Sequence, residues 1–441
     1  MRIRPFSVLV AVVAMCGALA SCTCSGSGAS GQGSGASGAQ TTGGGTGTAA
    51  APGMGEKAFR LENGLQVEIV DGPCGDAVGV AVLVNAGVDH DPVGRSGMAR
   101  LAGRLLAATP EGKAARGVEV GTEYTVYAIT TSAEKLDGEI DEVAAWMSKA
   151  APAEADFTRE RDAMLAEIDR LSGNDAAGTA LRLAEEAVQP TRGNGRRAGV
   201  AAEVKAITAE ELAAFWKAAY SPGNARIVVA GKVDAEKVKA KISAALGALP
   251  GGTPPAVARD PGDTTVKGTL VMGAAPSAIA WAVPAPGLKD PLFAPFLVLA
   301  SRLVDAPAEG RTWAVTYDPI RRPEVLLITQ PVGATEQPEP SAQRMRKEAT
   351  ALVGAPLGAD DVARAKERFR LFVEPALTDP ALCSKDARSF AIARARRAQL
   401  ALDAAAMTQA LEGVTKGQLD EAAKAFEAKQ SAAVIAGGAL P

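Results

Sequence analysis

Hydrophobic and polar positions alternate at the start of the regular part of the chain and then take helical spacing. Residues 59–70 alternate around Asn63-Gly64, a dipeptide favoured in β-hairpin turns. The stretch 76–84 is longer and largely apolar, and 97–108 carries apolar side chains at the spacing of a helix face. This pattern predicts a strand pair, a buried strand and an amphipathic helix.

Further periodicity predicts strands and helices in two successive stretches of the chain. In the first, strands are expected at 124–131 and 225–230, and helices at 136–150, 156–171, 176–188, 209–220 and 235–249. A segment rich in Pro and Gly, 250–261, then marks a boundary. In the second, strands are expected at 265–272, 278–283, 312–317, 325–329 and 433–436, and helices at 293–303 and in the segment that ends at Phe426.

The two stretches end alike, which indicates an internal repeat. Thr208 precedes one predicted helix, and the strand after that helix ends on Gly231. Thr415 precedes another predicted helix, and the strand after it ends on Gly437. Threonine is a favoured N-cap residue, so both helices are expected to begin there. The chain is therefore predicted to contain two tandem α+β domains, each a mostly antiparallel sheet covered by helices.

The N-terminal residues have the pattern of a secretion signal. Arg2 and Arg4 precede the apolar stretch 6–14, which is too short for a stable transmembrane helix. The Leu-Ala-Ser-Cys that follows resembles a bacterial lipobox, in which Cys22 becomes the lipidated first residue of the mature protein. An ordinary cleaved signal, with Cys22 incidental, is the alternative. Because no Asp follows Cys22, the resemblance to such lipoproteins implies the outer membrane, facing the periplasm.

Composition divides the chain into five segments. Residues 22–55 are mostly Gly, Ser, Thr and Ala with almost no charge, so they cannot bury enough apolar surface to fold. The predicted plan is a signal peptide (1–21), a flexible tether (22–55), an N-terminal domain (56–249), a linker (250–263) and a C-terminal domain (264–441). In this plan the lipid on Cys22 is the only membrane attachment.

Charge and the rare residue types exclude several classes of site. A net charge of -3, without a basic stripe, argues against nucleic-acid binding. His90 is the one histidine of the chain, which excludes any site that needs two. Cys74 and Cys383 could pair in an oxidising compartment, although two solitary cysteines are more often unpaired, so their state stays open.

Several segments resemble those of the pitrilysin/insulinase-type zinc peptidases. Residues 61–67 (Leu-Glu-Asn-Gly-Leu-Gln-Val) are similar to the first strand pair of that family, and 91–99 are similar to the lead-in to its zinc helix. Tyr-Ser-Pro-Gly-Asn at 220–224, with Val-Val-Ala-Gly-Lys-Val-Asp at 228–234, is similar to its closing motif. The first predicted domain matches well and the second matches in layout alone. The resemblance implies two insulinase-type domains.

The same resemblance shows what the chain lacks. In those peptidases the motif His-x-x-Glu-His binds zinc through two imidazoles and places a Glu that polarises water. Here the three functional positions are Arg100, Gly103 and Arg104. The third ligand of the family lies in a pair of Glu residues that Glu160 and Glu167 match, with Glu167 at the ligand position. The resemblance implies a member without catalytic residues, without a metal site and without a cofactor.

Two interpretations of Arg100 and Arg104 stay open. Four positions apart on a helix, they share one face. Their guanidinium groups either occupy the place of the lost ion and pair with Glu167, and with Glu160, or they point into solvent as most arginines do. The interval between the two motifs is also short for the family, and a helix is expected to be missing at 113–122. His90, between two Asp residues in a turn, is expected to be solvated.

Two further groups of charged and aromatic residues are candidates for a role. Arg311 and Tyr317 fall where the second domains of zinc-free family members contribute an Arg and a Tyr that hold substrate. They are possible substrate-holding residues, but an Arg and a Tyr on one strand are also common in ordinary sheets. Arg394, Arg396 and Arg397 lie in an alanine-rich helical stretch and are expected to form a solvated face.

The function implied by the resemblance is that of a catalytically inactive lipoprotein, the partner of a zinc-bearing peptidase subunit of the same family. It would help to bind unfolded peptides through shape and strand addition, which need no metal. The alternative is a structural scaffold of the cell envelope without peptide processing, like the silent core subunits of respiratory complexes that resemble this family. An active peptidase is a third, disfavoured interpretation.

Overall fold

The computed structural model describes the regular part of the chain, residues 55–72, 74–108, 117–149, 152–173, 176–188, 199–257, 271–272, 277–306, 311–318, 325–333, 335–373, 380–400, 404–427 and 429–436. The predicted signal peptide, the tether with Cys22, the end of the linker and most of the strand predicted at 265–272 lie outside these residues. The chain divides into two units, Met1–Thr48 and Ala49–Pro441, and every element below belongs to the second. Among the described residues, no helix is long and apolar enough to cross a membrane.

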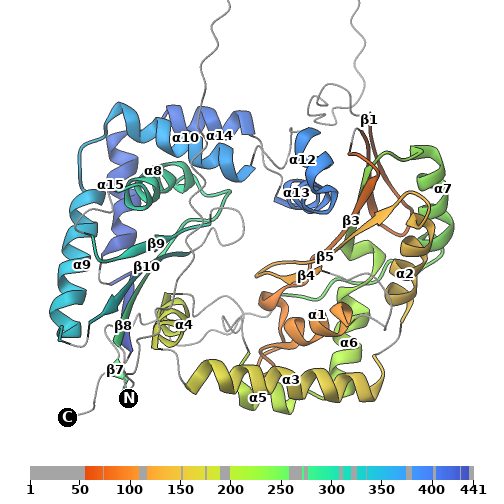
Figure 1. The fold of residues 1–441 in the computed structure, drawn as a ribbon, viewed down its shortest axis with the longest axis horizontal. Coiled ribbons are helices and arrows are strands. Elements are labelled where there is room, and N and C mark those ends of the chain that lie inside the picture. The colour runs from red at the N-terminus through yellow and green to blue at the C-terminus, as the bar shows by residue number, and fades with distance from the viewer. Residues whose placement is uncertain are drawn as a thin grey trace, which may run out of the picture. The chain divides into compact units, whose positions relative to one another are not determined.

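The first half of the chain forms a six-stranded sheet in the order β1-β2-β6-β3-β5-β4 (Figure 1). Its strands are β1 (Gly55–Arg60), β2 (Gln66–Asp71), β3 (Ala77–Val84), β4 (Gly117–Val120), β5 (Thr125–Ser132) and β6 (Ala225–Gly231). β1 and β2 form the predicted hairpin, with Phe59 opposite Val67. Only β2 and β6 pair in parallel among the described strands of this sheet, so the expectation of a mostly antiparallel sheet is confirmed.

Helices from the same half cover one face of this sheet. They are α1 (Met98–Ala107), α2 (Leu136–Ser148), α3 (Glu154–Gly173), α5 (Ala201–Ala206), α6 (Ala209–Ala219) and α7 (Ala235–Leu246). Buried side chains of these helices, such as Leu101, Met164 and Trp216, lie in one hydrophobic cluster with the strand residues Val80 and Ile227. α1 packs against α3, β4 and β5, so its polar face is held beside these three elements.

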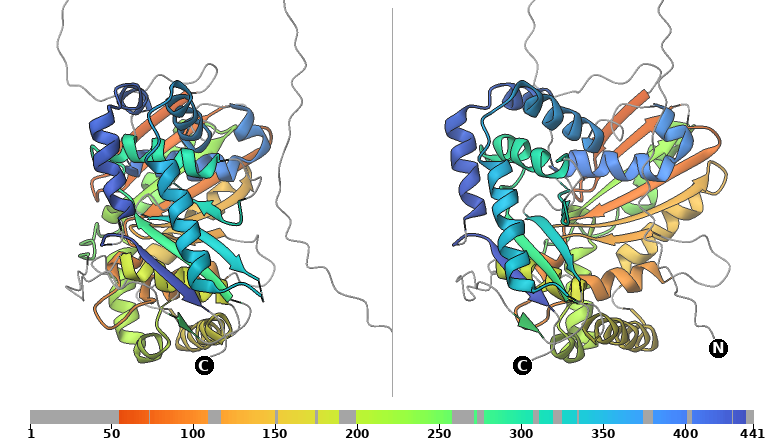
Figure 2. Two further views of the ribbon diagram at one scale, coloured as in Figure 1. Left: turned by 90° about the vertical axis from the view of Figure 1, so that its left-hand side faces the viewer. Right: turned by 60° about the vertical axis from the view of Figure 1, so that its left-hand side comes forward.

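The second half repeats this arrangement with a five-stranded sheet in the order β7-β11-β8-β10-β9. Its strands are β7 (Val271–Met272), β8 (Ser277–Pro284), β9 (Ala314–Thr316), β10 (Val325–Val332) and β11 (Ala432–Ala436). One face is covered by α8 (Phe293–Val304), α9 (Pro338–Val353), α10 (Ala359–Val373), α14 (Ala404–Glu412) and α15 (Lys416–Ala423), which Figure 2 shows from two sides. The α+β fold with two similar sheets, as predicted, is confirmed.

The repeat is also visible in the way corresponding helices begin. Thr208 caps α6 by accepting a hydrogen bond from the N–H of Glu211, whose side chain accepts one from the backbone of Thr208. Thr415 and Gln418 make the same reciprocal pair at the start of α15. Such a capping box satisfies two backbone donors that a helix N-terminus leaves free, so the sequence alone fixes both starts.

Each half covers the outer face of the other half's sheet, which the patterns did not indicate. α13 (Ala387–Leu400), preceded by α12 (Pro380–Lys385), lies on the first sheet, where Phe390 joins a buried cluster with Leu83 and Val228 (Figure 1). α4 (Ala176–Val188) covers the second sheet in the same way through small residues such as Ala180 and Ala184. Both predicted helices are present, but their packing partners lie in the other half.

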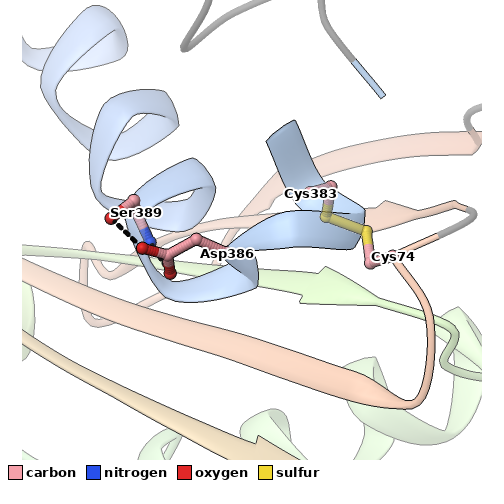
Figure 3. The surroundings of a disulfide bond; sticks show 4 residues. All are labelled: Cys74, Cys383, Asp386 and Ser389. Carbon is pink, nitrogen blue, oxygen red and sulfur yellow. Dashed lines mark hydrogen bonds between the residues drawn. A yellow bond between two sulfur atoms is a disulfide. The ribbon is translucent and has the colours of Figure 1, made fainter. Parts of the chain in front are cut away.

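A disulfide bond joins the two halves. Cys74, in the connection between β2 and β3, is bonded to Cys383 of α12, with the two Cα atoms 4.6 Å apart and a sequence separation of 309 (Figure 3). Both residues are fully buried. The expectation that these cysteines are more often unpaired is therefore wrong, because the exchanged helix brings together two residues that are remote in sequence.

The arginine cluster of α13 also differs from expectation. Arg394 and Arg396 are each only 8% exposed, so they do not form a solvated face. Arg394 pairs with Glu68 of β2 at 2.5 Å and with Glu56 of β1 at 2.9 Å, and Arg396 pairs with Glu119 of β4 at 2.6 Å. The stretch looks solvated in isolation because its partners belong to the opposite half of the chain.

Candidate functional site

The place of the zinc motif lies on α1, and its start is fixed from within the preceding loop. The carboxylate of Asp91 accepts hydrogen bonds from the N–H groups of Gly97 at 2.6 Å and Ala99 at 2.7 Å. Asp91 is only 1% exposed, and this burial raises its pKa to about 7, although the two backbone hydrogen bonds act to lower it. The adjacent charges of Asp89 and Glu203 raise it slightly further.

The loop before α1 is also tied to α5 and α6. Arg95 pairs with Glu211 of α6 at 2.8 Å, and Glu203 of α5 accepts a hydrogen bond from the N–H of Ser96 at 2.8 Å. The hydroxyl of Ser96 accepts from the N–H of Val200 at 2.9 Å. The first turn of α1 is therefore held by contacts from residues more than a hundred positions away.

The two arginines of α1 are paired with the two glutamates of α3. Nη2 of Arg100 lies 2.7 Å from Oε1 of Glu167, and Nη1 of Arg104 lies 3.0 Å from Oε2 of the same carboxylate. Nε of Arg104 is 3.2 Å from Oε2 of Glu160. All four side chains are between 17% and 29% exposed, so solvent screens these pairs only in part. Of the two open interpretations, pairing is the one that the structure shows.

The position of the lost general base is closed by a strand. Gly103 is buried on α1, and a Cβ atom there would lie 2.5 Å from Cγ2 of Val120 and 3.4 Å from Cγ1 of Val118. Both valines belong to β4, the edge strand of the first sheet. β4 lies in the interval where a family helix was expected to be missing. A side chain at Gly103 would require the side chain of Val120, or the strand that carries it, to shift.

These residues do not fit a zinc ion. Arginine stays protonated and offers donors only, so the two guanidinium groups repel a cation and satisfy the carboxylates that would bind one. Zinc prefers three or four Cys, His, Asp or Glu ligands. Within the described part of the chain, no group of three or more such residues is placed to hold a metal ion.

His90 does not supply the missing ligand either. It ends a short 3₁₀ helix (Val88–His90), and its Nδ1 atom accepts a hydrogen bond from the N–H of Gly87 at 3.2 Å. Burial lowers its pKa. The residue is half-buried in the described structure, where full solvation was expected, and one ring nitrogen is committed to the backbone.

Arg311 and Tyr317 flank β9 in the second half. Nη1 of Arg311 donates to the carbonyl of Leu303 at 2.8 Å, and its guanidinium lies 4.7 Å from the ring centroid of Trp313. Tyr317 is buried, with its ring 5.6 Å from that of Phe296. These contacts are the kind that ordinary sheet residues make, and neither side chain is brought to the arginine–glutamate cluster by any described contact.

Sequence reasoning found the arginine–glutamate cluster but missed the features around it. The closure at Gly103 depends on β4, a short strand that carries too few residues for a clear alternation. The burial of Arg394 and the disulfide depend on the exchanged helix. One signal in the sequence could have indicated buried charges on α13. The helix is rich in alanine, which suits close packing, yet it also carries several arginines that need partners.

Comparisons with known proteins bear on the fold of the chain. Residues 206–314 match a family described as the peptidase M16 inactive domain. No curated protein matches the chain by sequence. A solved protease from Helicobacter pylori is 17% identical with a TM-score of 0.69, over 87% of this chain and 100% of that one. The peptidase M16 inactive domain from Pseudomonas fluorescens is 15% identical with a TM-score of 0.67, over 88% and 98%.

One further structure is longer than this chain. The periplasmic protease PqqL from Escherichia coli is 15% identical with a TM-score of 0.64, over 88% of this chain but 48% of that one. At these identities the structural likenesses show the fold. The family match covers the segment from the end of α5 to the start of β9, which includes the connection between the two halves.

Proposed function

We propose that this chain, a pitrilysin/insulinase-type (M16) protein by family match and by fold, is a catalytically inactive member that acts as the partner of a zinc-bearing subunit. The resemblance deduced from its sequence motifs is confirmed by that match and that fold. Its role is to complete a peptide-binding assembly whose chemistry is carried out by the other subunit.

The observation that carries this proposal is the state of the α1–α3 site. The degenerate motif positions Arg100, Gly103 and Arg104 provide neither ligand nor base, and Glu167 is already occupied by two guanidinium groups. Val120 occupies the space that a base at Gly103 would need. Loss of the motif is thus accompanied by structure that compensates for it, as expected of a chain kept for another purpose.

The size of PqqL is consistent with a paired arrangement of two such units. This chain matches about half the length of PqqL, so a protein of that size holds room for two such units in one chain. A zinc-bearing member of the same fold is the partner that would restore an active site.

Peptide binding needs no metal in this role. Sheet edges such as β4 present unpaired backbone groups, to which an extended peptide can add as a further strand. β4 also lies directly against α1, beside the arginine–glutamate cluster. An unfolded peptide held there would be positioned by backbone hydrogen bonds.

Export to the cell envelope is part of the same proposal. The lipobox-like Cys22 carries this expectation from the sequence, and the Cys74–Cys383 bridge supports it independently, because disulfides persist in oxidising compartments. The proposed location is the outer membrane facing the periplasm, with the lipid on Cys22 as the only anchor.

The test is the zinc content of the full chain, isolated without a histidine tag from detergent-solubilised envelopes. Elemental mass spectrometry of the separated chain is expected to give a ratio near zero. The assembly in which it was isolated is expected to carry zinc on its second subunit and to cleave an unfolded peptide. About one zinc per separated chain after dialysis would refute the proposal, and a zinc-free assembly would favour an envelope scaffold.

A further inference from the structure

The contact between α12–α13 and the outer face of the first sheet has features that packing alone does not require. A buried apolar cluster holds Phe390, Ala391 and Ala395 of α13 against Leu83 and Ala230 of the sheet. Asp386 caps α13 by accepting from the N–H of Ser389 at 2.9 Å, close behind the bridged Cys383 (Figure 3). The start of this helix is thus fixed within one turn of the disulfide.

The sheet is shaped to receive the start of α13. A Cβ atom at Gly79 of β3 would lie 1.9 Å from the carbonyl oxygen of Ala387 and 2.8 Å from the backbone nitrogen of Arg388. Only glycine permits this approach, because both contacts are with backbone that cannot rotate away. The fit is therefore specific to α13 in this position.

Buried charges fix the other end of the contact. Arg394 places its guanidinium between Glu68 and Glu56, and Arg394 and Glu68 are both largely excluded from solvent. Arg396 reaches the edge strand β4 through Glu119. Separation of α13 from the sheet would leave these charges without their partners in a partly apolar surface, which is costly.

The bond between Cys74 and Cys383 joins the same two surfaces covalently. It closes a loop of 309 residues, and both cysteines are inaccessible to solvent. A reductant can reach the sulfur atoms only after α12 has left the sheet. The packing of α12 therefore shields the disulfide from reductant, and the disulfide keeps α12 on the sheet.

We propose that α12–α13 and the Cys74–Cys383 bond form a lock that is set on oxidation and holds the two halves of this chain together. In setting the lock, the two thiols exchange with the disulfide of an exported thiol oxidase, which takes up both protons and both electrons and leaves as a dithiol. The lock holds the two sheets and their helices as one stiff body. The lock itself does not depend on the proposed partner.

The test uses the full chain purified from envelopes. Peptide mass mapping without reductant is expected to find the Cys74 and Cys383 peptides linked. Hydrogen exchange is then compared between the wild type and the Cys74→Ala/Cys383→Ala variant. Amides of Ala387–Leu400 are expected to exchange at least about tenfold faster in the variant, while those of α8 and α9 keep their rates.

Two controls separate the lock from general stabilisation. Ala349→Gly, a fully buried position in α9, destabilises the second half without touching the bridge and is expected to leave the exchange of α13 unchanged. Wild type that is reduced and alkylated provides the same comparison without substitution. Unlinked thiols in the purified chain, unchanged exchange at α13, or uniform loosening of the whole chain would each overturn the proposal.

Discussion

Oε1 of Glu167 lies 2.7 Å from Nη2 of Arg100, so an acidic residue of α3 holds a basic residue of α1 at the positions that the sequence resemblance aligns with a zinc motif. The two guanidinium groups of Arg100 and Arg104 neutralise carboxylates that α3 turns towards α1. These ion pairs hold α1 and α3 together without a metal ion.

The first prediction concerns Arg104→Ala, which removes part of the ion-pair cluster between α1 and α3. Glu167 and Glu160 would each lose one partner in a site that is about a quarter exposed, and the free energy of unfolding should fall by about 1–3 kcal/mol. Urea unfolding measures the loss. The control is Lys416→Ala on α15, whose side chain is 84% exposed and pairs with Asp420, and which should change stability by less than about 1 kcal/mol. Equal effects would mean that the α1–α3 pairs are no more than surface contacts.

A second prediction concerns Gly103. Gly103→Glu should destabilise the chain by about 1–3 kcal/mol, because its Cβ would lie 2.5 Å from Cγ2 of Val120 and the valine or its strand must shift. Val120→Ala combined with Gly103→Glu should recover part of that loss. Thermal unfolding of the single and double variants gives the coupling between the two positions. If the double variant loses as much as the sum of the two single variants, β4 does not close this site.

The third prediction is a pH dependence from Asp91. Its pKa in the folded chain is raised to about 7 from an ordinary value of 3.8 by burial, so the folded state binds this proton more strongly. The stabilisation is complete below about pH 4 and is lost as the pH rises to about 7, with a slope of up to ~1.4 kcal/mol per pH unit. Asp91→Asn removes the titrating group, so the variant lacks this contribution to the pH dependence of stability.

Unfolding of wild type and Asp91→Asn in urea at several pH values checks this slope. The difference between the two free energies of unfolding should shift in favour of the variant between pH 4 and 7 and then level off. The variant starts from a lower stability, because the NH2 group of asparagine cannot accept one of the two hydrogen bonds that Oδ1 and Oδ2 of Asp91 accept from Ala99 and Gly97. A difference that does not change with pH would show that Asp91 stays ionised throughout.

The fourth prediction concerns Arg394. Arg394→Met would leave the carboxylate of Glu68 buried without its cation, at a cost of about 3–5 kcal/mol in the free energy of unfolding. Lys385→Ala, at an exposed position of α12, is the control and should be nearly neutral. Chemical unfolding of both variants in the oxidised state makes the comparison. A neutral Arg394→Met would show that this charge behaves as the solvated face that the sequence suggested.

The sequence by itself determined most of the elements and the starts of two capped helices. Alternation around Asn63-Gly64 produced the β1–β2 hairpin, and the reciprocal caps at Thr208 and Thr415 set the starts of α6 and α15. These features depend on residues a few positions apart, so local hydrogen bonding and periodicity are sufficient to predict them. Arg100 and Arg104 were identified by the resemblance of their segment to a zinc-helix motif, and their spacing of one turn places them on one face of the helix.

Only the tertiary structure decided what those residues contact. Whether Arg104 meets Glu160, whether Val120 closes the space at Gly103, and whether Cys74 meets Cys383 depend on pairings between distant segments. Arg394 is the clearest case, because its partner Glu68 is 326 positions away and on the opposite half of the chain. The contacts of Arg394 and Cys383 follow from the packing of α12–α13 on the first sheet, and those of Arg104 and Val120 follow from the packing of α1 against α3 and β4. The local pattern of a single helix records neither arrangement.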